Sequence, residues 1–391
     1  MKELSYIFLT FLKLGATAFG GYMSLVALVQ RQIVEIDKKL GEEDLLDGIS
    51  FISVLPGPFA VNVCTYVGYR LKGILGAITA FTGIILPSFI MVVTLSYFYF
   101  TYDNIPTIKS LFNGVMPAII ALIITVATGM TRKNIKRRSQ WLLCLVAAVL
   151  LICIGGFMVT CLLIIGSGIL GLFLYKGSES DIPDTYTKGT SSVKKQIFLI
   201  GMALLLLLPA FLWYGHQPNI PVCFKVLSAF SGVSLTLFGG GYVVIPALHE
   251  LFVENLGWLT SIEFADGIAI GQITPGPIFI TAAFIGYKIA AIPGTVLATV
   301  GIFAPPALVT IISSYFVSTF IHSPKIKAAM KGIHPAVIGM IFASAFILAK
   351  GVAFSIPALL IFLAVLFLSF KYNISPVYLI IGAGVTGIII L

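Results

Sequence analysis

Two stretches decide the fold of this chain: LLDGISFISVLPGP at residues 45–58 and FADGIAIGQITPGP at residues 264–277. Each is an apolar run of helical length that ends in a Pro-Gly-Pro (PGP) triplet, at residues 56–58 and 275–277. Proline removes a backbone donor and clashes with the preceding turn, while glycine adds conformational freedom. We therefore expect a helix to stop and restart at each triplet.

The match between the two stretches extends outward and indicates an internal repeat. FLKLGATAFGG at 11–21 resembles FSGVSLTLFGG at 230–240, and both Asp47 and Pro56 recur 219 positions later in the chain. Chance similarity between apolar segments would match leucine and valine rather than glycine, proline and aspartate in register. The repeat predicts an N-terminal domain at 1–175 with its core at 11–120. It predicts a C-terminal domain at 196–391 with its core at 230–338.

Composition places both domains in a membrane. Of 391 residues, 59% are apolar and 10% are charged, against about 25% charged in ordinary globular proteins. These values exclude a soluble enzyme, a nucleic-acid-binding domain and a disordered chain. The fold class is therefore all-α, a polytopic protein in a lipid bilayer with about 10–13 transmembrane helices. Candidate spans lie at 5–34, 49–69, 74–100, 109–130, two within 141–175, 196–214, 222–248, 264–287, 291–320, 330–350, 354–370 and 374–391.

Basic residues set the expected orientation. TRKNIKRRS at 131–139 carries five basic residues in nine and is placed in the cytoplasm by the positive-inside rule, which also explains the net charge of +9. The polar segment 176–195 is predicted to be a cytoplasmic linker, and the N-terminus is predicted to be cytoplasmic. Seven spans then separate the matching starts of the repeats. An odd number makes the repeats inverted, which is typical of secondary transporters.

The two breaks predict an anion site. In lipid, broken backbone survives only where protein or trapped water satisfies it. A restarted half-helix presents N–H groups and about half a positive charge at its N-terminus. A Pro kink that only shapes packing is the alternative, and close helix approach is the alternative for the Phe-Gly-Gly (FGG) motifs. The candidate substrate-binding residues are Gly20, Gly21, Pro56, Gly57, Pro58, Asn62, Gly239, Gly240, Gln272, Thr274, Pro275, Gly276, Pro277 and Thr281.

Charged residues inside or beside the spans are candidates for charge coupling, because each costs about 2.5–3.5 kcal/mol at a helix centre. For Arg70 and Lys288, snorkelling at the interface is the alternative. Asp47 and Asp266 are expected to start the PGP helices, where capping competes with proton or cation coupling. The candidates are Arg31, Asp47, Arg70, Glu250, Asp266 and Lys288; Arg31 and Glu250, at matching positions, would either pair or make the halves unequal.

No motif of an enzyme or a cofactor site is present. The chain lacks a Walker A motif, HExxH, a serine nucleophile elbow and metal-spaced Cys/His clusters. We expect no catalysis, no cofactor, no metal and no nucleic-acid partner. Five scattered cysteines are expected to be small apolar residues in helices.

The FGG–DG–PGP–GY series, in order and in both halves, resembles the chromate ion transporter (CHR) family. The second repeat is the closer match, through LTLFGGGYVVIPALHE and GWLTSIEFADGIAIGQITPGPIFITAAFIGYK. The resemblance implies a plasma-membrane carrier that exports chromate, with sulfate as a related oxyanion, and confers chromate resistance. It also implies a His and a Glu after the first FGG, where this chain has Ser24 and Gln30.

Three function classes follow: a secondary carrier for a tetrahedral oxyanion, an anion channel, and a membrane-embedded enzyme. Inverted repeats with broken helices occur in channels too, so sequence leaves the first two open. For the enzyme, His249 with Glu250 is the nearest candidate pair. Without an ATPase motif, a gradient must drive transport, and a negative cell interior favours exit of a dianion. A homodimer is left open by the sequence.

Overall fold

The computed structural model describes residues 2–18, 22–53, 55–102, 106–155, 157–175, 221–236, 244–314, 324–350, 355–372, 374 and 376–390. Every regular element in these ranges is a helix. The linker 176–195, the span predicted at 196–214, and the four candidate glycines Gly20, Gly21, Gly239 and Gly240 lie outside the described residues. We call residues 2–175 the first half and residues 221–390 the second half.

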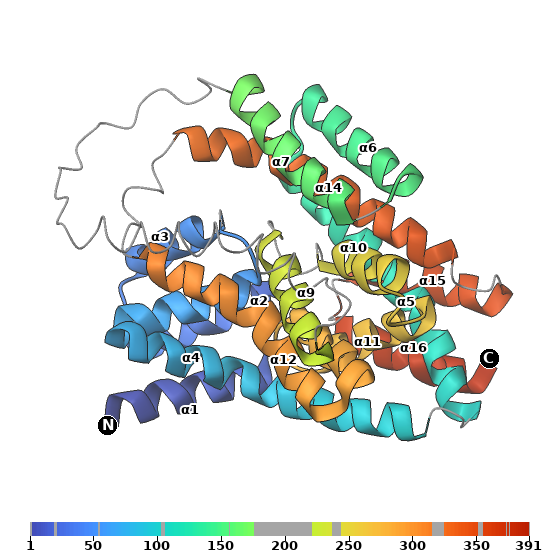
Figure 1. The fold of residues 1–391 in the computed structure, drawn as a ribbon, viewed down its shortest axis with the longest axis horizontal. Helices are drawn as coiled ribbons and strands as arrows, with labels where there is room; N and C mark the ends of the chain where they lie inside the picture. Colours follow the sequence, from blue (N-terminus) through green and yellow to red (C-terminus); the bar gives the residue numbers. More distant parts are fainter. Residues whose placement is uncertain are drawn as a thin grey trace.

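The same order of helices occurs in both halves (Figure 1). The first half contains α1 Lys2–Thr17, α2 Tyr22–Val29, the π-helix η1 Gln30–Ile36, α3 Glu42–Ile52, α4 Phe59–Thr101, α5 Pro106–Asn134, α6 Arg138–Cys153 and α7 Phe157–Leu174. The second half contains α9 Val222–Thr236, α10 Val244–His249, the π-helix η3 Glu250–Asn255, α11 Ser261–Ile273, the 3₁₀ turn η4 Ile278–Ile280, α12 Thr281–Ser314, α14 Pro324–Lys350, α15 Ile356–Tyr372 and α16 Pro376–Ile390.

Helix length and surface character confirm an all-α polytopic membrane protein. Within the described ranges, four stretches are long and apolar enough to cross a bilayer: Phe59–Thr101, Asn113–Arg132, Ile278–Ser314 and Ala328–Lys350. Apolar side chains also cover outer faces. On α6, Leu142 and Leu145 are each 62% exposed, one helical turn apart. Such a surface suits lipid rather than water.

Both long helices turn back on themselves at the same place. In α4 the backbone leaves helical geometry at Lys72 and Gly73, where φ is 61° at the glycine. In α12 the same happens at Ala290 and Ala291, with φ of 46° at Ala291. Residues on either side then touch, because a Cβ placed on Gly68 would collide with the Gly76 carbonyl. Eight residues along a straight helix would separate them by about 12 Å. Each long helix is therefore two antiparallel segments, 59–71 and 74–101 in α4, and 281–289 and 292–314 in α12.

The PGP triplets lie at the tips of helical hairpins. In the first half, the Arg70 guanidinium pairs with Asp44, and the Tyr66 hydroxyl donates to the Asp44 carbonyl at 3.3 Å. These contacts join the start of α3 to the end of segment 59–71. We call the unit made of α3, the PGP triplet and segment 59–71 hairpin 1. The corresponding unit, α11 with η4 and segment 281–289, is hairpin 2.

Hairpin geometry corrects two predicted spans. The segments predicted at 49–69 and 264–287 do not run on through the membrane after the PGP break. They reverse there. The 11 residues of α3 reach about 16 Å, roughly half the 30 Å of a hydrocarbon core. A sequence shows that a Pro-Gly-Pro triplet breaks a helix, but not whether the chain continues or returns.

The segment that precedes each PGP hairpin folds back as well, which brings the end of η1 to α1 and η3 to α9. Tyr6 on α1 donates a hydrogen bond to Asp37, which follows η1, and the Lys39 ammonium lies 3.6 Å from the centre of the Tyr6 ring. In the second half, Phe230 of α9 stacks on Phe252 of η3 at 4.4 Å. The single continuous spans predicted at 5–34 and 222–248 are therefore hairpins too.

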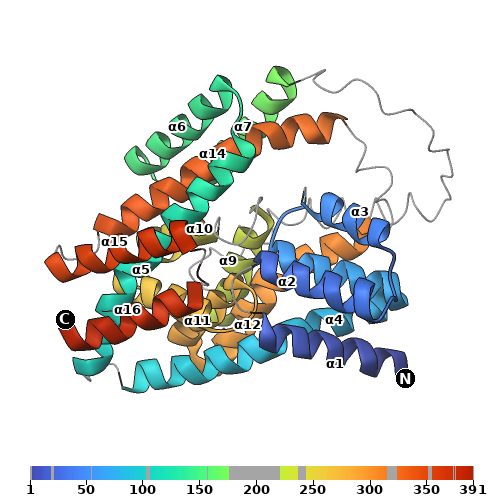
Figure 2. The same ribbon diagram turned by 180° about the vertical axis from the view of Figure 1, so that it is seen from behind.

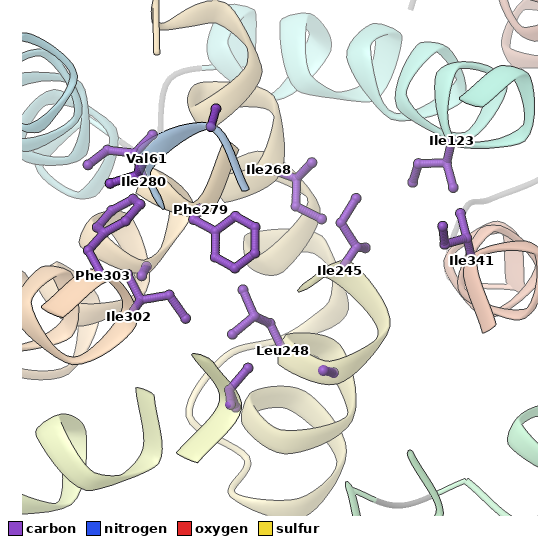
Figure 3. Close-up of a cluster of buried hydrophobic side chains, with 14 of the residues drawn as sticks. Val61, Ile123, Ile245, Leu248, Ile268, Phe279, Ile280, Ile302, Phe303 and Ile341 are labelled. Atoms are coloured by element: carbon purple, nitrogen blue, oxygen red, sulfur yellow. The ribbon is translucent and has the colours of Figure 1, made fainter. Parts of the chain in front are cut away.

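The two halves interlock through their later helices. α14 of the second half packs on α6 and α7 (Figure 1), and α5 of the first half packs on α15 and α16 (Figure 2). Both packings use close backbone approach, at Gly114 against Gly387 and at Gly332 against Gly171. Small residues at such crossings are typical of membrane helices. Figure 3 shows the core between the halves, where Ile123 of α5 faces Ile341 of α14.

Candidate functional site

The backbone at each hairpin tip has the geometry that the Pro-Gly-Pro triplet predicts. α3 ends at Ile52 and α11 at Ile273, and the next helical turns begin directly after Pro58 and Pro277. Gly57 and Gly276 have φ of 96° and 111°, a region that side chains rarely allow. The glycine makes the reversal possible, and the second proline directly precedes the returning helix.

The two tips pack against equivalent places on the opposite half. A Cβ on Gly57 would collide with the Pro306 ring on α12, and a Cβ on Gly276 would collide with the Ser88 hydroxyl on α4. The Gly276 N–H also donates to the carbonyl of Ala18, at the end of α1, at 2.9 Å. Each half therefore inserts its tip into the other. In the sequence, Ala18 directly precedes the first FGG motif.

The returning helices point their N-termini at these tips. The Asn62 N–H bonds to the Pro58 carbonyl at 3.0 Å, and the Ile280 N–H bonds to the Pro277 carbonyl at 3.0 Å. The N–H groups that precede them in each first turn lie at the positive end of the helix dipole. This arrangement is suited chemically to an anion.

Candidate polar side chains near the tips make local hydrogen bonds. The Asn62 amide group donates to the Pro56 carbonyl at 3.0 Å and fastens the first break. The hydroxyls of Thr274 and Thr281 donate to carbonyls of their own turns, those of Gly271 and Ile278. Gln272 is partly buried. The structure thus groups these predicted residues at two tips, in roles that shape the backbone.

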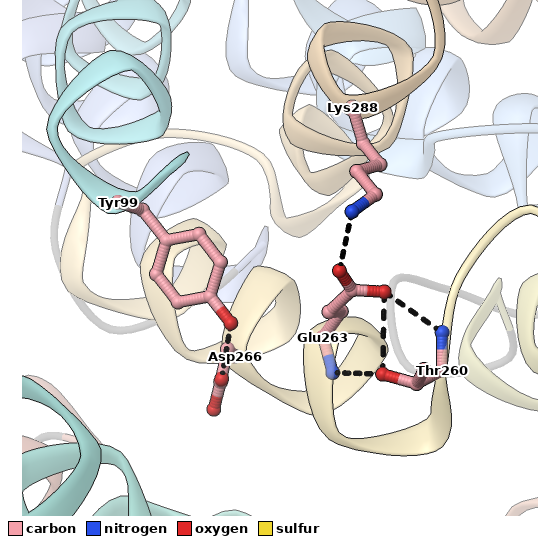
Figure 4. Close-up of polar contacts among 5 residues, drawn as sticks. All are labelled: Tyr99, Thr260, Glu263, Asp266 and Lys288. Atoms are coloured by element: carbon pink, nitrogen blue, oxygen red, sulfur yellow. Dashed lines mark hydrogen bonds and ion pairs between the residues drawn. The ribbon is translucent and has the colours of Figure 1, made fainter. Parts of the chain in front are cut away.

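The basic candidates, Arg70 and Lys288, form ion pairs at the base of each hairpin, the end opposite its tip. Arg70 pairs with Asp44, and Lys288 pairs with Glu263 at 2.6 Å (Figure 4). Glu263 also accepts from the Thr260 backbone N–H, which completes a capping box at the start of α11. Sequence reasoning overlooked both acids. The signal was present, because the two acid–base pairs occupy matching positions of the repeat.

Asp47 and Asp266 do not start the PGP helices, which corrects the expectation. α3 begins at Glu42 and α11 at Ser261, so both aspartates lie in the second turn, beyond the reach of capping. Their surroundings differ. Asp47 is exposed, whereas Asp266 is 3% exposed and accepts a hydrogen bond from the Tyr99 hydroxyl at 2.7 Å (Figure 4). Tyr99 was missed, since 167 residues separate it from its partner.

Arg31 and Glu250 also have different environments in the two halves. Arg31 is exposed on η1, while Glu250 is buried on η3, where its carboxylate lies against Gly155 between α6 and α7. Both residues belong to π-helices, which are rare and often occur at functional sites. No local sequence signal predicted the π-helices.

Comparison with known proteins decides the family. The family model described as chromate transporter matches residues 5–172 and 224–388, which is most of each half. This chain belongs to the chromate transporter family. The two matched regions begin 219 positions apart, the same spacing that separates the two PGP triplets.

Three similar proteins align over nearly the whole chain. A probable chromate transport protein of Synechococcus elongatus is 31% identical over 100% of this chain and 95% of its own length. The chromate transport protein of Cupriavidus metallidurans is 29% identical over 99% and 93%. An uncharacterized transporter of Methanocaldococcus jannaschii is 31% identical over 96% and 92%. No solved structure matches the chain.

Proposed function

We propose that this protein exports chromate, or a related tetrahedral oxyanion such as sulfate, across the plasma membrane and binds it at the tips of the PGP hairpins. The observation that carries the proposal is the reciprocal packing of the tips, Gly57 against Pro306 and Gly276 against Ser88. It brings two helix N-termini into the protein interior. Membership of the chromate transporter family and its named chromate transport proteins support the substrate class.

Electrostatics supports a dianion at this place. Two helix N-termini offer roughly one positive charge in total, without the desolvation cost of a buried lysine or arginine. The hairpin legs reach about halfway through the hydrocarbon core, so the tips lie near the midplane. Central sites built from broken helices are typical of carriers that expose one site alternately to each side.

Inverted repeats remain part of the proposal. The hairpin that joins α1 to η1 and hairpin 1 each replace one predicted crossing, so the predicted number of crossings between equivalent starts falls from seven to five. Five is still odd. The hairpin ends that carry the Arg70–Asp44 and Lys288–Glu263 pairs would then lie at opposite faces of the membrane, with the N-terminus in the cytoplasm.

A membrane potential provides enough energy for export. Moving a dianion outward through 100 mV is favourable by about 4.6 kcal/mol, twice the value for one charge. Uptake would instead need at least two co-transported cations merely to cancel the charge. We propose export driven mainly by the potential, with a smaller proton contribution through the buried Asp266. Copies of the chain could pair as a homodimer, and this stays a prediction.

Proteoliposomes with a clamped potential test the proposal. At equal pH and equal chromate on both sides, chromate flux should reverse when the imposed potential reverses. Sulfate and molybdate, tested in the same vesicles, define the substrate range. Flux that follows only a pH or sulfate gradient would contradict potential-driven export and indicate electroneutral exchange. Flux that neither saturates with chromate nor is slowed by competing oxyanions would favour a channel over a carrier.

A further inference from the structure

The tips of the two PGP hairpins have different neighbours. Gly276 at the tip of hairpin 2 lies against Ser88 of α4, and a Cβ on this glycine would be 3.3 Å from Ser88 Cβ. Gly57 at the tip of hairpin 1 lies against Pro306 of α12. Ser88 and Pro306 occupy matching positions of the repeat. A hydroxyl donor therefore faces one tip, and an apolar ring faces the other.

The Ser88 hydroxyl is buried and unused. Its side chain is 0% exposed, and its oxygen has no hydrogen-bond partner among the described residues. Hydroxyls in membrane helices usually donate to a carbonyl of the preceding turn. On the same helix, Thr79, Thr82 and Thr94 all do so, at 2.6–2.9 Å. A buried polar group without a partner is unfavourable by about 1–3 kcal/mol, so its presence calls for an explanation.

Polar groups at the other tip have the opposite character. Asn62 is 0% exposed and its amide nitrogen is engaged by the Pro56 carbonyl. Its side-chain oxygen, which can only accept hydrogen bonds, has no partner among the described residues. An unpaired acceptor repels an oxyanion, whereas an unpaired donor attracts one.

We propose that Ser88 is a substrate-binding residue, whose hydroxyl donates to the oxyanion at the tip of hairpin 2. This inference rests on the proposed function, because it assumes an oxyanion at the hairpin tips. The ligand would sit between the Ser88 hydroxyl and the helix N-terminus that follows Pro277. The tip of hairpin 1, with Pro306 and the Asn62 oxygen, would contribute its helix N-terminus to the site but no side-chain donor to the anion.

Saturation kinetics of Ser88→Ala test the inference in proteoliposomes containing the full chain. The KM for chromate should rise at least tenfold, equivalent to about 1.4 kcal/mol of lost binding. The control is Ser96→Ala, on the same helix and two turns further from the tip. It also removes a buried hydroxyl that has no hydrogen-bond partner in the described part of the chain. It should stay within twofold of the original chain. Stabilisation of the detergent-solubilised protein by chromate, measured as a shift in Tm, should fall only in Ser88→Ala.

The possible outcomes distinguish a failure of the Ser88 role from a failure of the proposed function. An original chain that neither transports nor is stabilised by chromate, sulfate or molybdate contradicts the proposed function. An active original chain with unchanged KM and unchanged stabilisation in Ser88→Ala overturns the role of Ser88 alone. Equal losses in Ser88→Ala and Ser96→Ala also overturn it, since they indicate a packing effect. If Ser88→Ala is not monodisperse, Ser88→Cys replaces it, because a thiol has a similar volume and is a much weaker donor.

Discussion

Hairpin 1 and hairpin 2 have the same backbone but different side-chain chemistry. Both reverse at a glycine with positive φ, both are closed at the base by an ion pair, and both lead into a second sharp turn. Yet the second-turn aspartate is exposed in hairpin 1 and buried against Tyr99 in hairpin 2. The comparison shows that the residues that shape the backbone recur in both hairpins, while the surroundings of the second-turn aspartate and the side chain opposite the tip differ.

The largest expected effect concerns what the hairpins share. Gly57→Ala and Gly276→Ala should each reduce chromate transport at least 100-fold, because a side chain at φ of 96° or 111° is strained and collides with Pro306 or Ser88. Replacing either whole PGP triplet by alanines should abolish transport while leaving insertion largely intact. Transport by purified variants, with size-exclusion profiles as the folding check, measures this. Retained export in both triplet variants would refute an anion site at the tips.

Neutralising Asp266 and Asp47 in turn tests whether the two hairpins differ in function. Asp266→Asn should lower chromate flux about tenfold and remove its dependence on an imposed pH gradient, because this carboxylate is buried beside Tyr99. Asp47→Asn, the matched control at the equivalent position, should stay within twofold, since water already solvates that group. Flux under opposite pH gradients at fixed potential distinguishes them. Equal losses in both variants would show that the two hairpins are functionally alike.

The ion pairs at the hairpin bases should matter less, and equally in both halves. Arg70 and Lys288 are each 38% exposed at their side chains, so solvent screens them and each pair contributes at most about 1 kcal/mol. Arg70→Gln and Lys288→Gln should therefore lower Tm by a few degrees and change KM little. Thermal unfolding in low and high salt measures this. A tenfold loss of transport in one variant alone would instead indicate a gate at that face.

The smallest effect concerns the ring that packs on the start of each hairpin. Tyr66 in hairpin 1 corresponds to Phe284 in hairpin 2. The Tyr66 hydroxyl donates to the Asp44 carbonyl at 3.3 Å and accepts from the Arg70 guanidinium at 3.5 Å. Tyr66→Phe gives both hairpins a phenylalanine at this position and should cost only about 0.5 kcal/mol of stability, because both hydrogen bonds of the hydroxyl are long. Denaturation monitored by near-ultraviolet circular dichroism checks it. A change in chromate KM would show that the Tyr66 hydroxyl has a role beyond stability.

Sequence predicted the features of the fold that depend on backbone chemistry. Proline and glycine have strong local effects, so the breaks at residues 56–58 and 275–277 could be located, and their regular spacing predicted the repeat. The direction of the chain after each break could not be predicted. It depends on tertiary contacts such as Gly48 against Tyr66 and Gly267 against Phe284, where a Cβ on the glycine would collide with the ring.

Long-range partners were the other part that sequence could not predict. The Tyr99 hydroxyl of the first half donates to Asp266 of the second half, and Ser88 of the first half lies against Gly276 of the second half. The sequence marks both aspartates as unusual in apolar segments, but burial of one copy and exposure of the other follow from packing. The candidate glycines of the FGG motifs lie outside the described residues, so their role stays a prediction.

The interlocking of the later helices has a consequence for how the protein is made. α5 leaves the ribosome long before α15 and α16, against which it packs, and α14 emerges long after α6 and α7. After insertion, the Gly114 face of the first half has no packing partner until α16, which carries Gly387, is synthesised near the end of the chain. A ribosome that stops between the halves leaves a fragment that lacks its native packing partners, a natural substrate for membrane quality control.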